Sequence, residues 1–333
     1  MILMSPSAKH PLRILLAQPR GFCAGVVRAI DIVERALVKH GAPVYVRHEI
    51  VHNKFVVQSL TDKGAIFIAE LDEIPLHHRK TKPVIFSAHG VPKSVPQDAA
   101  SKAMYWIDAT CPLVSKVHRE IERFYDEGSQ ILMIGHHGHP EVIGTMGQLP
   151  QGVVRLIETR NDVETLDIAI DTPLAFVTQT TLSVDDTQEI VTALKAKYPH
   201  IRSSKAEDIC YATTNRQEAV KAIAPSCEAF IIIGAPNSSN SNRLVDVARK
   251  AGVKHAFLLQ RANQLDWNLL EGITTLGLSS GASAPDILVQ ELIEKIRQYY
   301  DVTLDLHIAR KERVKFSLPK ALRDVPPIQS GLA

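Results

Sequence analysis

The stretch RGFCAG, residues 20–25, forms a turn around Cys23 and leads directly into a helical pattern of apolar residues. Cys111 and Cys210 have the same setting, each between a turn and a helical pattern. The gaps between successive cysteines are 88 and 99 residues, so no two of them form a Cys-x-x-Cys pair. In a chain built as a threefold repeat, these spacings bring one thiol from each repeat to a common centre.

Nine short segments rich in Val, Ile, Leu and Phe predict buried strands, because each is bounded by Gly, Pro or polar residues. Helical patterns lie between many of them, and this alternation favours α/β units with mainly parallel sheets. The predicted strands are 44–47, 65–69, 84–87, 131–134, 153–157, 174–177, 230–233, 256–259 and 275–278.

Two further series of polar residues, taken from the ends of predicted strands, repeat at similar spacing. Their gaps are 87 and 101 residues in one series and 91 and 103 in the other. We therefore predict three α/β repeats, 12–107, 108–206 and 207–300, and a C-terminal tail, 301–333. Because 202–209 is polar, the third repeat is expected to open irregularly. The series are His52, His139 and Asn240, and His89, Thr180 and Ser283.

Composition excludes several classes of protein. The net charge of +2 gives no basic field for nucleic acid, and no apolar run is long enough to span a membrane. The first 11 residues lack the apolar core of a signal peptide and are interpreted as a short loose tail. Four cysteines in 333 residues do not form a secreted disulfide framework, so we expect a cytoplasmic protein. No GxxxxGK[ST] or GxGxxG motif is present, which argues against an NTPase or a dinucleotide fold.

The cysteines are expected to bind metal, because a helix amino end favours the thiolate form. Three thiolates also suit zinc with one open position. Zinc sites usually contain a close pair of ligands, which is absent here. The wide spacing therefore favours one 4Fe–4S cluster per chain, with its fourth iron facing a cavity. Cys227 follows a helix, breaks the series and is predicted to be structural.

Ligands bind beyond the carboxyl ends of parallel strands, so the polar strand ends are expected to line one central cavity. Their side chains are hydrogen-bond donors that suit an anion such as phosphate. Helix amino ends add to anion binding, and Gly90 and Gly281 allow close backbone approach. The candidate anion-binding residues are His52, His89, His139, Thr181, Ser238, Asn240 and Ser283.

Glu141 stands two residues after His139. A carboxylate in an anion pocket repels the ligand, so its presence predicts another task, the donation or relay of a proton. The alternative is a glutamate in the first turn of a helix that favours the helix dipole.

These stretches closely resemble the 4-hydroxy-3-methylbut-2-enyl diphosphate reductase family, which completes the non-mevalonate isoprenoid pathway. The resemblance covers roughly residues 12 to 320. The matching stretches are PRGFCAG (19–25), VHN (51–53), FSAHGV (86–91), DATCP (108–112), GHPE (138–141), TQTTLS (178–183), CYATTNRQ (210–217), NSSNSNRL (237–244) and GASAP (281–285).

The resemblance implies a trefoil of three pseudo-threefold-related α/β domains around a central 4Fe–4S cluster held by the three cysteines. It implies Glu141 as proton donor, with Thr180 ordering it and His139 beside them. An external flavodoxin- or ferredoxin-type donor would supply electrons to an allylic diphosphate substrate. The residues implied to hold the diphosphate are His52, His89, Ser238, Ser239, Asn240 and Ser283, with His139 and Thr181 nearby.

The implied reaction is reductive dehydroxylation to isopentenyl and dimethylallyl diphosphate. A second hypothesis is a non-redox enzyme of the quinolinate synthase or dehydratase type, which also uses a three-cysteine cluster as a Lewis acid. A third is a non-enzymatic iron–sulfur sensor, which leaves Glu141 without a task.

The stretch 302–322 has strand-like pieces and basic residues. It is interpreted as a solvated face, a cover for the domain junction or a dock for an acidic electron donor.

Overall fold

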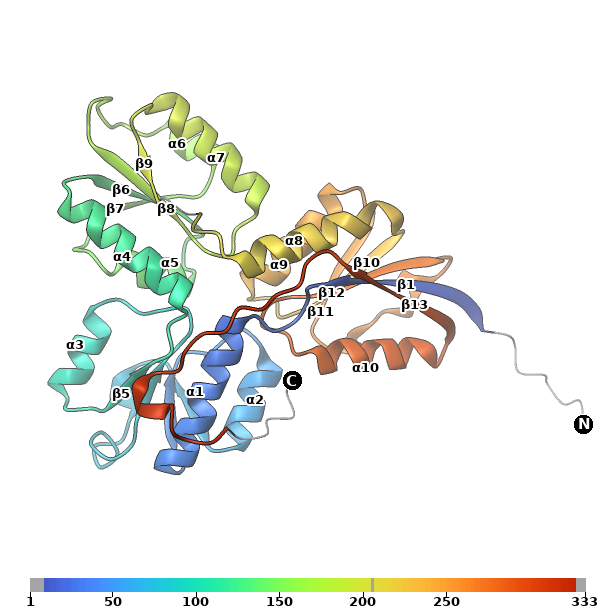
Figure 1. Cartoon of the computed structure of the whole chain (residues 1–333), viewed down its shortest axis with the longest axis horizontal. Coiled ribbons are helices and arrows are strands. Elements are labelled where there is room, and N and C mark those ends of the chain that lie inside the picture. The colour runs from blue at the N-terminus through green and yellow to red at the C-terminus, as the bar shows by residue number, and fades with distance from the viewer. Residues whose placement is uncertain (1–8, 205–206, 328–333) are drawn as a thin grey trace, which may run out of the picture. The chain divides into compact units, whose positions relative to one another are not determined.

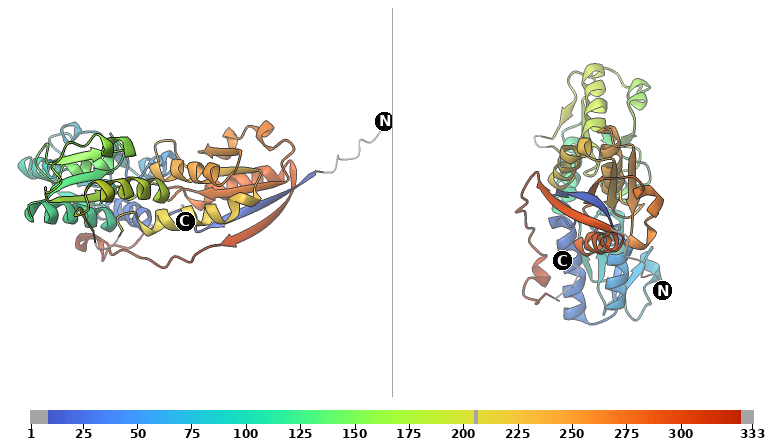
Figure 2. Two further views of the ribbon diagram at one scale, coloured as in Figure 1. Left: turned by 90° about the horizontal axis from the view of Figure 1, so that it is seen from above. Right: turned by 90° about the vertical axis from the view of Figure 1, so that its right-hand side faces the viewer.

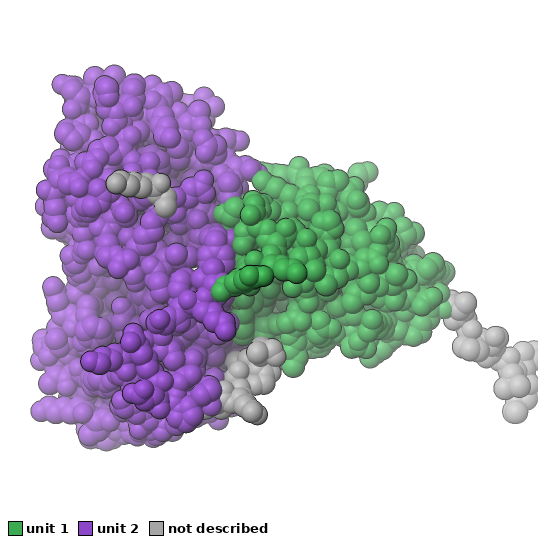
Figure 3. All heavy atoms as spheres, in the orientation of Figure 1, with its two compact units in different colours: residues 1–22, 214–313, 331–333 green, residues 23–213, 314–330 purple. Residues whose placement is uncertain are grey.

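The computed structural model describes residues 9–204 and 207–327 (Figure 1). The chain divides into two compact units (Figure 3). Unit 1 comprises residues 1–22, 214–313 and 331–333, and unit 2 comprises residues 23–213 and 314–330. In the described residues, no helix is long and apolar enough to cross a membrane.

Unit 2 contains two four-stranded parallel sheets with the same strand order. The first has the order β3-β2-β4-β5 and the second β7-β6-β8-β9. In each sheet the first strand in sequence lies between the second and the third. The strands are β2 (Val44–Arg47), β3 (Ala65–Ile68), β4 (Val84–Phe86), β5 (Trp106–Asp108), β6 (Gln130–Ile134), β7 (Val154–Ile157), β8 (Leu174–Thr178) and β9 (Arg202–Ser203).

Unit 1 contains one five-stranded parallel sheet, with the order β11-β10-β12-β1-β13. Its first three positions repeat the pattern of unit 2, and β1 from the N-terminal region takes the place beside β12. β1 and β13 run side by side over their whole length (Figure 2). The strands are β1 (His10–Gln18), β10 (Ala229–Ile233), β11 (His255–Leu259), β12 (Thr275–Ser280) and β13 (Tyr300–Ile308).

The helices connect these strands and cover the sheets. In unit 2, α4 packs on one face of the second sheet through Val117, Ile121 and Phe124. α7 packs on the other face through Ile190 and Leu194. The helices are α1 (Ala24–His40), α2 (Lys54–Asp62), α3 (Ser94–Ser101), α4 (Pro112–Asp126), α5 (Pro140–Met146), α6 (Arg160–Glu164), α7 (Val184–Lys197), α8 (Tyr211–Ile223), α9 (Ser239–Lys250) and α10 (Asp286–Arg297).

All nine predicted strands are present, with bounds that differ by no more than two residues. The described residues form three parallel sheets, in agreement with the predicted α/β class and three domains. The exact domain boundaries stay a prediction. The expectation of a loose tail to residue 11 was wrong for His10 and Pro11, which begin β1, while residues 1–8 lie outside the described residues. β9 is only two residues long, as expected for the polar stretch before Cys210.

Candidate active site

Each of the three cysteines lies at the start of a helix, as predicted, and all three belong to unit 2. Cys23 is the N-cap of α1, and its Sγ accepts a hydrogen bond from the N–H of Val26 at 3.4 Å. Cys111 is the N-cap of α4, and its N–H donates to the carbonyl of Ala88 at 2.9 Å. Cys210 directly precedes α8. The ends of β4 and β8 therefore fix the backbone at Cys111 and Cys210, since the N–H of Cys210 donates to Thr180.

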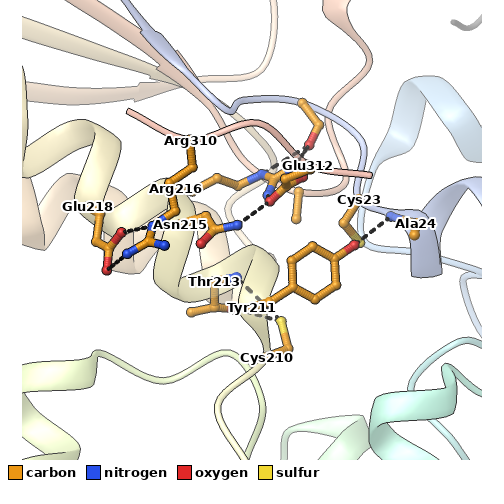
Figure 4. A network of polar contacts seen from close by, with 12 residues as sticks. Cys23, Ala24, Cys210, Tyr211, Thr213, Asn215, Arg216, Glu218, Arg310 and Glu312 are labelled. Carbon is orange, nitrogen blue, oxygen red and sulfur yellow. Dashed lines mark hydrogen bonds and ion pairs between the residues drawn. The ribbon is translucent and has the colours of Figure 1, made fainter. Parts of the chain in front are cut away.

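The thiols of Cys23 and Cys111 border the same small space. A Cβ atom placed on Gly25 would lie 2.8 Å from Sγ of Cys111 and 3.7 Å from Sγ of Cys23. Glycine at this position of α1 therefore leaves room for the sulfur of Cys111 beside that of Cys23. The hydroxyl of Tyr211 accepts a hydrogen bond from the N–H of Ala24 at 3.4 Å, so the starts of α1 and α8 are also joined (Figure 4).

The electrostatic environment of the thiols suits a cationic centre. Burial raises the pKa of Cys111 to about 12 and that of Cys210 to about 11, and a charge on Cys23 raises both further. A bound metal reverses this balance, because it replaces the thiol protons and neutralises the repulsion between thiolates. Among the described residues, no three His, Cys, Asp or Glu side chains are placed to hold a single metal ion. The cysteines of an iron–sulfur cluster bind separate irons, so their sulfurs need not meet at one point.

Three histidines of unit 2 form a cluster, which we call the histidine cluster: His52, His89 and His139. The ring centroids of His52 and His89 are 4.1 Å apart, and His139 lies 5.8 Å from the first and 6.0 Å from the second. They follow β2, β4 and β6 respectively, so the two sheets bring together three of the predicted strand ends.

Two members of the histidine cluster, His89 and His139, favour the neutral form. Burial lowers the pKa of His139 to about 4 and that of His89 well below its usual value, and the neighbouring histidines lower both further. Nδ1 of His139 accepts a hydrogen bond from the N–H of Glu141 at 3.1 Å, which leaves the ring proton on Nε2. Nδ1 of His89 is buried without a hydrogen-bond partner. Nδ1 of His89 is therefore available to a ligand, because buried polar groups require hydrogen-bond partners.

Glu141 is buried in α5, with 2% of its surface exposed. Its Oε1 accepts the N–H of Thr180 at 2.6 Å, and its Oε2 lies 2.9 Å from the hydroxyl of Thr180. Burial raises the pKa of Glu141 to about 7, although both bonds from Thr180 favour the carboxylate. A carboxyl group with a pKa near neutrality can hold a proton and deliver it.

Asp208 is a residue that the sequence argument missed. It is 8% exposed, and its Oδ2 accepts the N–H of Thr178 at 3.1 Å while Oδ1 pairs with Lys116 at 3.1 Å. It therefore fixes the end of β8 two residues before Thr180, and its charge helps to raise the pKa of Glu141. Its position in the polar stretch before Cys210 gave no sign that it is buried. Thr181, which was predicted, has its hydroxyl 2.9 Å from Nε2 of Gln179.

The remaining predicted site residues lie in unit 1. Ser238 is the N-cap of α9, and its Oγ accepts a hydrogen bond from the N–H of Ser241 at 3.3 Å. Oδ1 of Asn240 accepts the N–H of Ala282 at 2.9 Å, which joins the start of α9 to the loop after β12. Nδ2 of Asn240 is buried without a hydrogen-bond partner. Ser283 lies in that same loop and is 7% exposed, while Ser239 begins α9.

Cys227 lies apart from these groups, in the apolar core of unit 1. Its Sγ donates to the carbonyl of Ile223 at 3.2 Å and packs against the cluster that includes Phe230 and Leu244. These contacts fit the predicted structural role.

The fold and these side chains define an α/β protein of parallel sheets, with three cysteines at helix starts, a histidine cluster and a buried acid. Residues 14–297 match the family described as LytB protein, and the chain belongs to this family.

Relatives similar to this chain are named 4-hydroxy-3-methylbut-2-enyl diphosphate reductase. The protein from Ruegeria pomeroyi is 60% identical over 315 residues, which cover 95% of this chain and 98% of the relative. The protein from Mesorhizobium japonicum is 58% identical over 331 residues, which cover 99% of this chain and 98% of the relative. Both alignments extend over almost the whole of each protein.

Two solved structures also resemble this chain. The E-1-hydroxy-2-methyl-but-2-enyl-4-diphosphate reductase of Plasmodium falciparum matches with a TM-score of 0.88 and 38% identity, over 94% of this chain and 97% of that chain. A structure described as (E)-4-hydroxy-3-methyl-but-2-enyl diphosphate reductase, the terminal enzyme of the non-mevalonate pathway, matches with a TM-score of 0.61 and 30% identity. That match covers 86% of this chain and 99% of the other.

Proposed function

We propose that this chain is a 4-hydroxy-3-methylbut-2-enyl diphosphate reductase, an iron–sulfur oxidoreductase of the non-mevalonate isoprenoid pathway. It replaces the allylic hydroxyl of the substrate by hydrogen and gives isopentenyl and dimethylallyl diphosphate. The observation that carries this proposal is the 60% identity to the Ruegeria pomeroyi reductase over 95% of the chain.

The cofactor in this proposal is one 4Fe–4S cluster per chain, held by Cys23, Cys111 and Cys210. The support is chemical: three thiols at helix starts, with Gly25 leaving space beside two of them, and pKa values that metal binding would lower. When bound, the cluster supplies electrons and a Lewis-acidic iron that polarises the hydroxyl oxygen of the substrate.

Glu141 is the proposed proton donor to the departing hydroxyl oxygen. Its pKa of about 7 lets it hold a proton at neutral pH, and the two contacts with Thr180 fix the plane of its carboxyl group. His139 orients the start of α5, because its ring accepts the N–H of Glu141. Thr180 and His139 thus position Glu141, and the hydrogen bonds from Thr180 also lower its pKa.

The diphosphate of the substrate is proposed to bind polar residues that follow the ends of the parallel strands. In unit 2 the histidine cluster offers ring N–H donors, and in unit 1 the buried Nδ2 of Asn240 is a donor without a partner. Binding of an anion would compensate both, since buried polar groups require hydrogen-bond partners. The proposed diphosphate-binding residues are His52, His89, His139, Thr181, Ser238, Ser239, Asn240 and Ser283.

An external flavodoxin- or ferredoxin-type protein is the proposed electron donor, and the cytoplasm is the proposed location. The test is anaerobic incubation of the iron-loaded protein with a reduced dye and the substrate. The dye is expected to become oxidised only when substrate is present. A non-redox enzyme of the quinolinate synthase or dehydratase type consumes no electrons, so an unoxidised dye together with conversion of the substrate would contradict the proposal.

A further inference from the structure

Arg216 holds the backbone just before the first cysteine. Its side chain is 0% exposed, and Nε and Nη2 donate to the carbonyl of Gly21 at 3.1 and 2.7 Å. Gly21 lies two residues before Cys23, and Arg216 lies on α8, the helix that begins directly after Cys210. The buried guanidinium of Arg216 therefore connects two segments of the chain: the turn before Cys23 and the helix after Cys210.

Glu312 neutralises this buried cation. It lies in the stretch that follows β13, residues 309–327, which we call the C-terminal segment. Oε1 of Glu312 accepts from Nη1 of Arg216 at 3.0 Å, and Oε2 accepts from Nη2 at 3.3 Å (Figure 4). Nδ2 of Asn215 donates to the same carboxylate at 3.0 Å. A buried charge is stable only when it is paired, so the position of Arg216 depends on Glu312.

Arg28 makes the equivalent connection for the second cysteine, within unit 2. Its Nη1 donates to the carbonyls of Ala109 and Thr110 at 3.2 and 3.0 Å, directly before Cys111. Its Nε donates to the carbonyl of Ser317 at 2.9 Å. The same C-terminal segment is thus bound by two arginines, at residues only five positions apart.

We propose that residues 312–317 act as a brace for the proposed cluster: through Arg216 and Arg28 they hold the loops that carry Cys23 and Cys111. The inference rests on the proposed function, because it requires the cluster. Mutation of groups that do not touch the metal but position its ligands typically changes metal affinity by about 10–100-fold. Loss of either arginine contact should therefore make the cluster dissociate faster. Arg216, Glu312 and Arg28 are positioning residues in this account.

The chain provides a matched control for each half of the brace. Arg310 and Glu218 form an ion pair between the same segment and the same helix as Glu312 and Arg216, but 59% and 42% of these side chains are exposed. Lys39 of α1 donates to the carbonyl of Ala321 at 2.7 Å, so it too holds the C-terminal segment. Neither control contact involves a residue next to a cysteine.

The first experiment compares Glu312→Gln with Glu218→Gln. Each protein is loaded with iron and sulfide without oxygen, and the loss of its brown absorption is followed after an iron chelator is added. Glu312→Gln should lose the absorption about tenfold faster than wild type, whereas Glu218→Gln should match wild type. The melting temperature of each metal-free protein shows whether a faster loss reflects the site or the whole fold. Equal rates for the two variants would overturn the inference.

A second pair of variants covers the case in which Glu312→Gln does not fold. Arg28→Lys keeps a cation near Cys111 but loses the fork that reaches three carbonyls, while Lys39→Gln loses only a contact with the segment. Arg28→Lys should lose its cluster faster, and Lys39→Gln should not. Equally fast cluster loss in both variants would show that any contact holding the C-terminal segment has the same effect. That result would overturn the specific role of Arg28. A wild-type protein that takes up no iron would contradict the proposed function itself and this inference with it.

Discussion

Thr180 contacts both oxygens of the buried carboxyl group of Glu141, with its N–H 2.6 Å from Oε1 and its hydroxyl 2.9 Å from Oε2. The same residue accepts the N–H of Cys210 on its carbonyl. The proposed acid and one proposed cluster ligand are therefore positioned by a single residue at the end of β8. This relationship makes the role of Glu141 testable apart from that of the cysteines.

Glu141→Gln removes the proton donor but keeps the size and hydrogen-bonding capacity of the side chain. We expect a folded, brown protein whose turnover falls by about 100-fold or more, the usual contribution of a general acid. Iron content and anaerobic turnover with reduced dye measure the two effects separately. Turnover near the wild-type level would remove Glu141 from the proposed role.

The activity of the wild type should depend on the protonation of Glu141. Because the acid works in its protonated form and its pKa is about 7, turnover should fall as the pH rises above that value. The hydroxyl of Thr180 lowers this pKa, so Thr180→Val should raise it and move the falling limb to higher pH. The measurement is the pH profile of kcat for both proteins. A limb that moves to lower pH contradicts the assignment.

His139 should make the free energy of unfolding depend on pH. The pKa of His139 is about 4 in the folded protein and about 6.5 when unfolded, so the unfolded state binds more protons between these values. Its contribution is neutral above about pH 6.5 and becomes increasingly destabilising as the pH falls toward 4. The raised pKa of Glu141 has the opposite effect, because it stabilises the folded state as the pH falls below about 7. The contribution of His139 must therefore be measured by comparing wild type with a His139 variant.

His139→Asn isolates this contribution, because Asn is also a good N-cap for α5. The drop in the melting temperature of the metal-free protein between pH 7 and pH 5 should be smaller in His139→Asn than in wild type. His255→Asn, at an exposed position of β11, serves as the control and should behave as wild type. An unchanged pH dependence in His139→Asn would show that His139 does not titrate as described.

Substitution of a proposed ligand cysteine and of the structural cysteine should have different effects on the iron content of the protein. Cys111→Ser is expected to lose iron, because the serine hydroxyl is a much poorer ligand than a thiolate, whereas Cys227→Ser should keep it. Iron analysis after anaerobic loading measures both. Equal loss in the two variants would contradict the assignment of three ligands.

Periodicity predicted the strands well, because buried parallel strands appear as short apolar runs between turns. The settings of Cys23, Cys111 and Cys210 were also visible, since each turn and helix start is local in sequence. β1 was missed, although 12–17 is strongly apolar, because its partners β12 and β13 lie more than 250 residues away. Only the folded sheet shows that the N-terminal region completes unit 1.

The buried polar residues were the hardest to predict. Asp208 lies in no motif, and the stretch CYATTNRQ, which contains Arg216, gave no sign that this arginine is buried. Their burial follows from long-range packing, as the contact between Arg216 and Gly21 shows across 195 positions of sequence. Glu141 was found because a carboxylate beside predicted anion-binding residues required an explanation.

The most direct test of the central claim is the number of electrons consumed per molecule of product. Iron-loaded protein, reduced dye and 4-hydroxy-3-methylbut-2-enyl diphosphate are mixed without oxygen, and dye oxidation and products are measured together. The account predicts one pair of electrons for each isopentenyl or dimethylallyl diphosphate formed. Conversion of the substrate without dye oxidation, or no conversion by a protein that holds its full cluster, would contradict it.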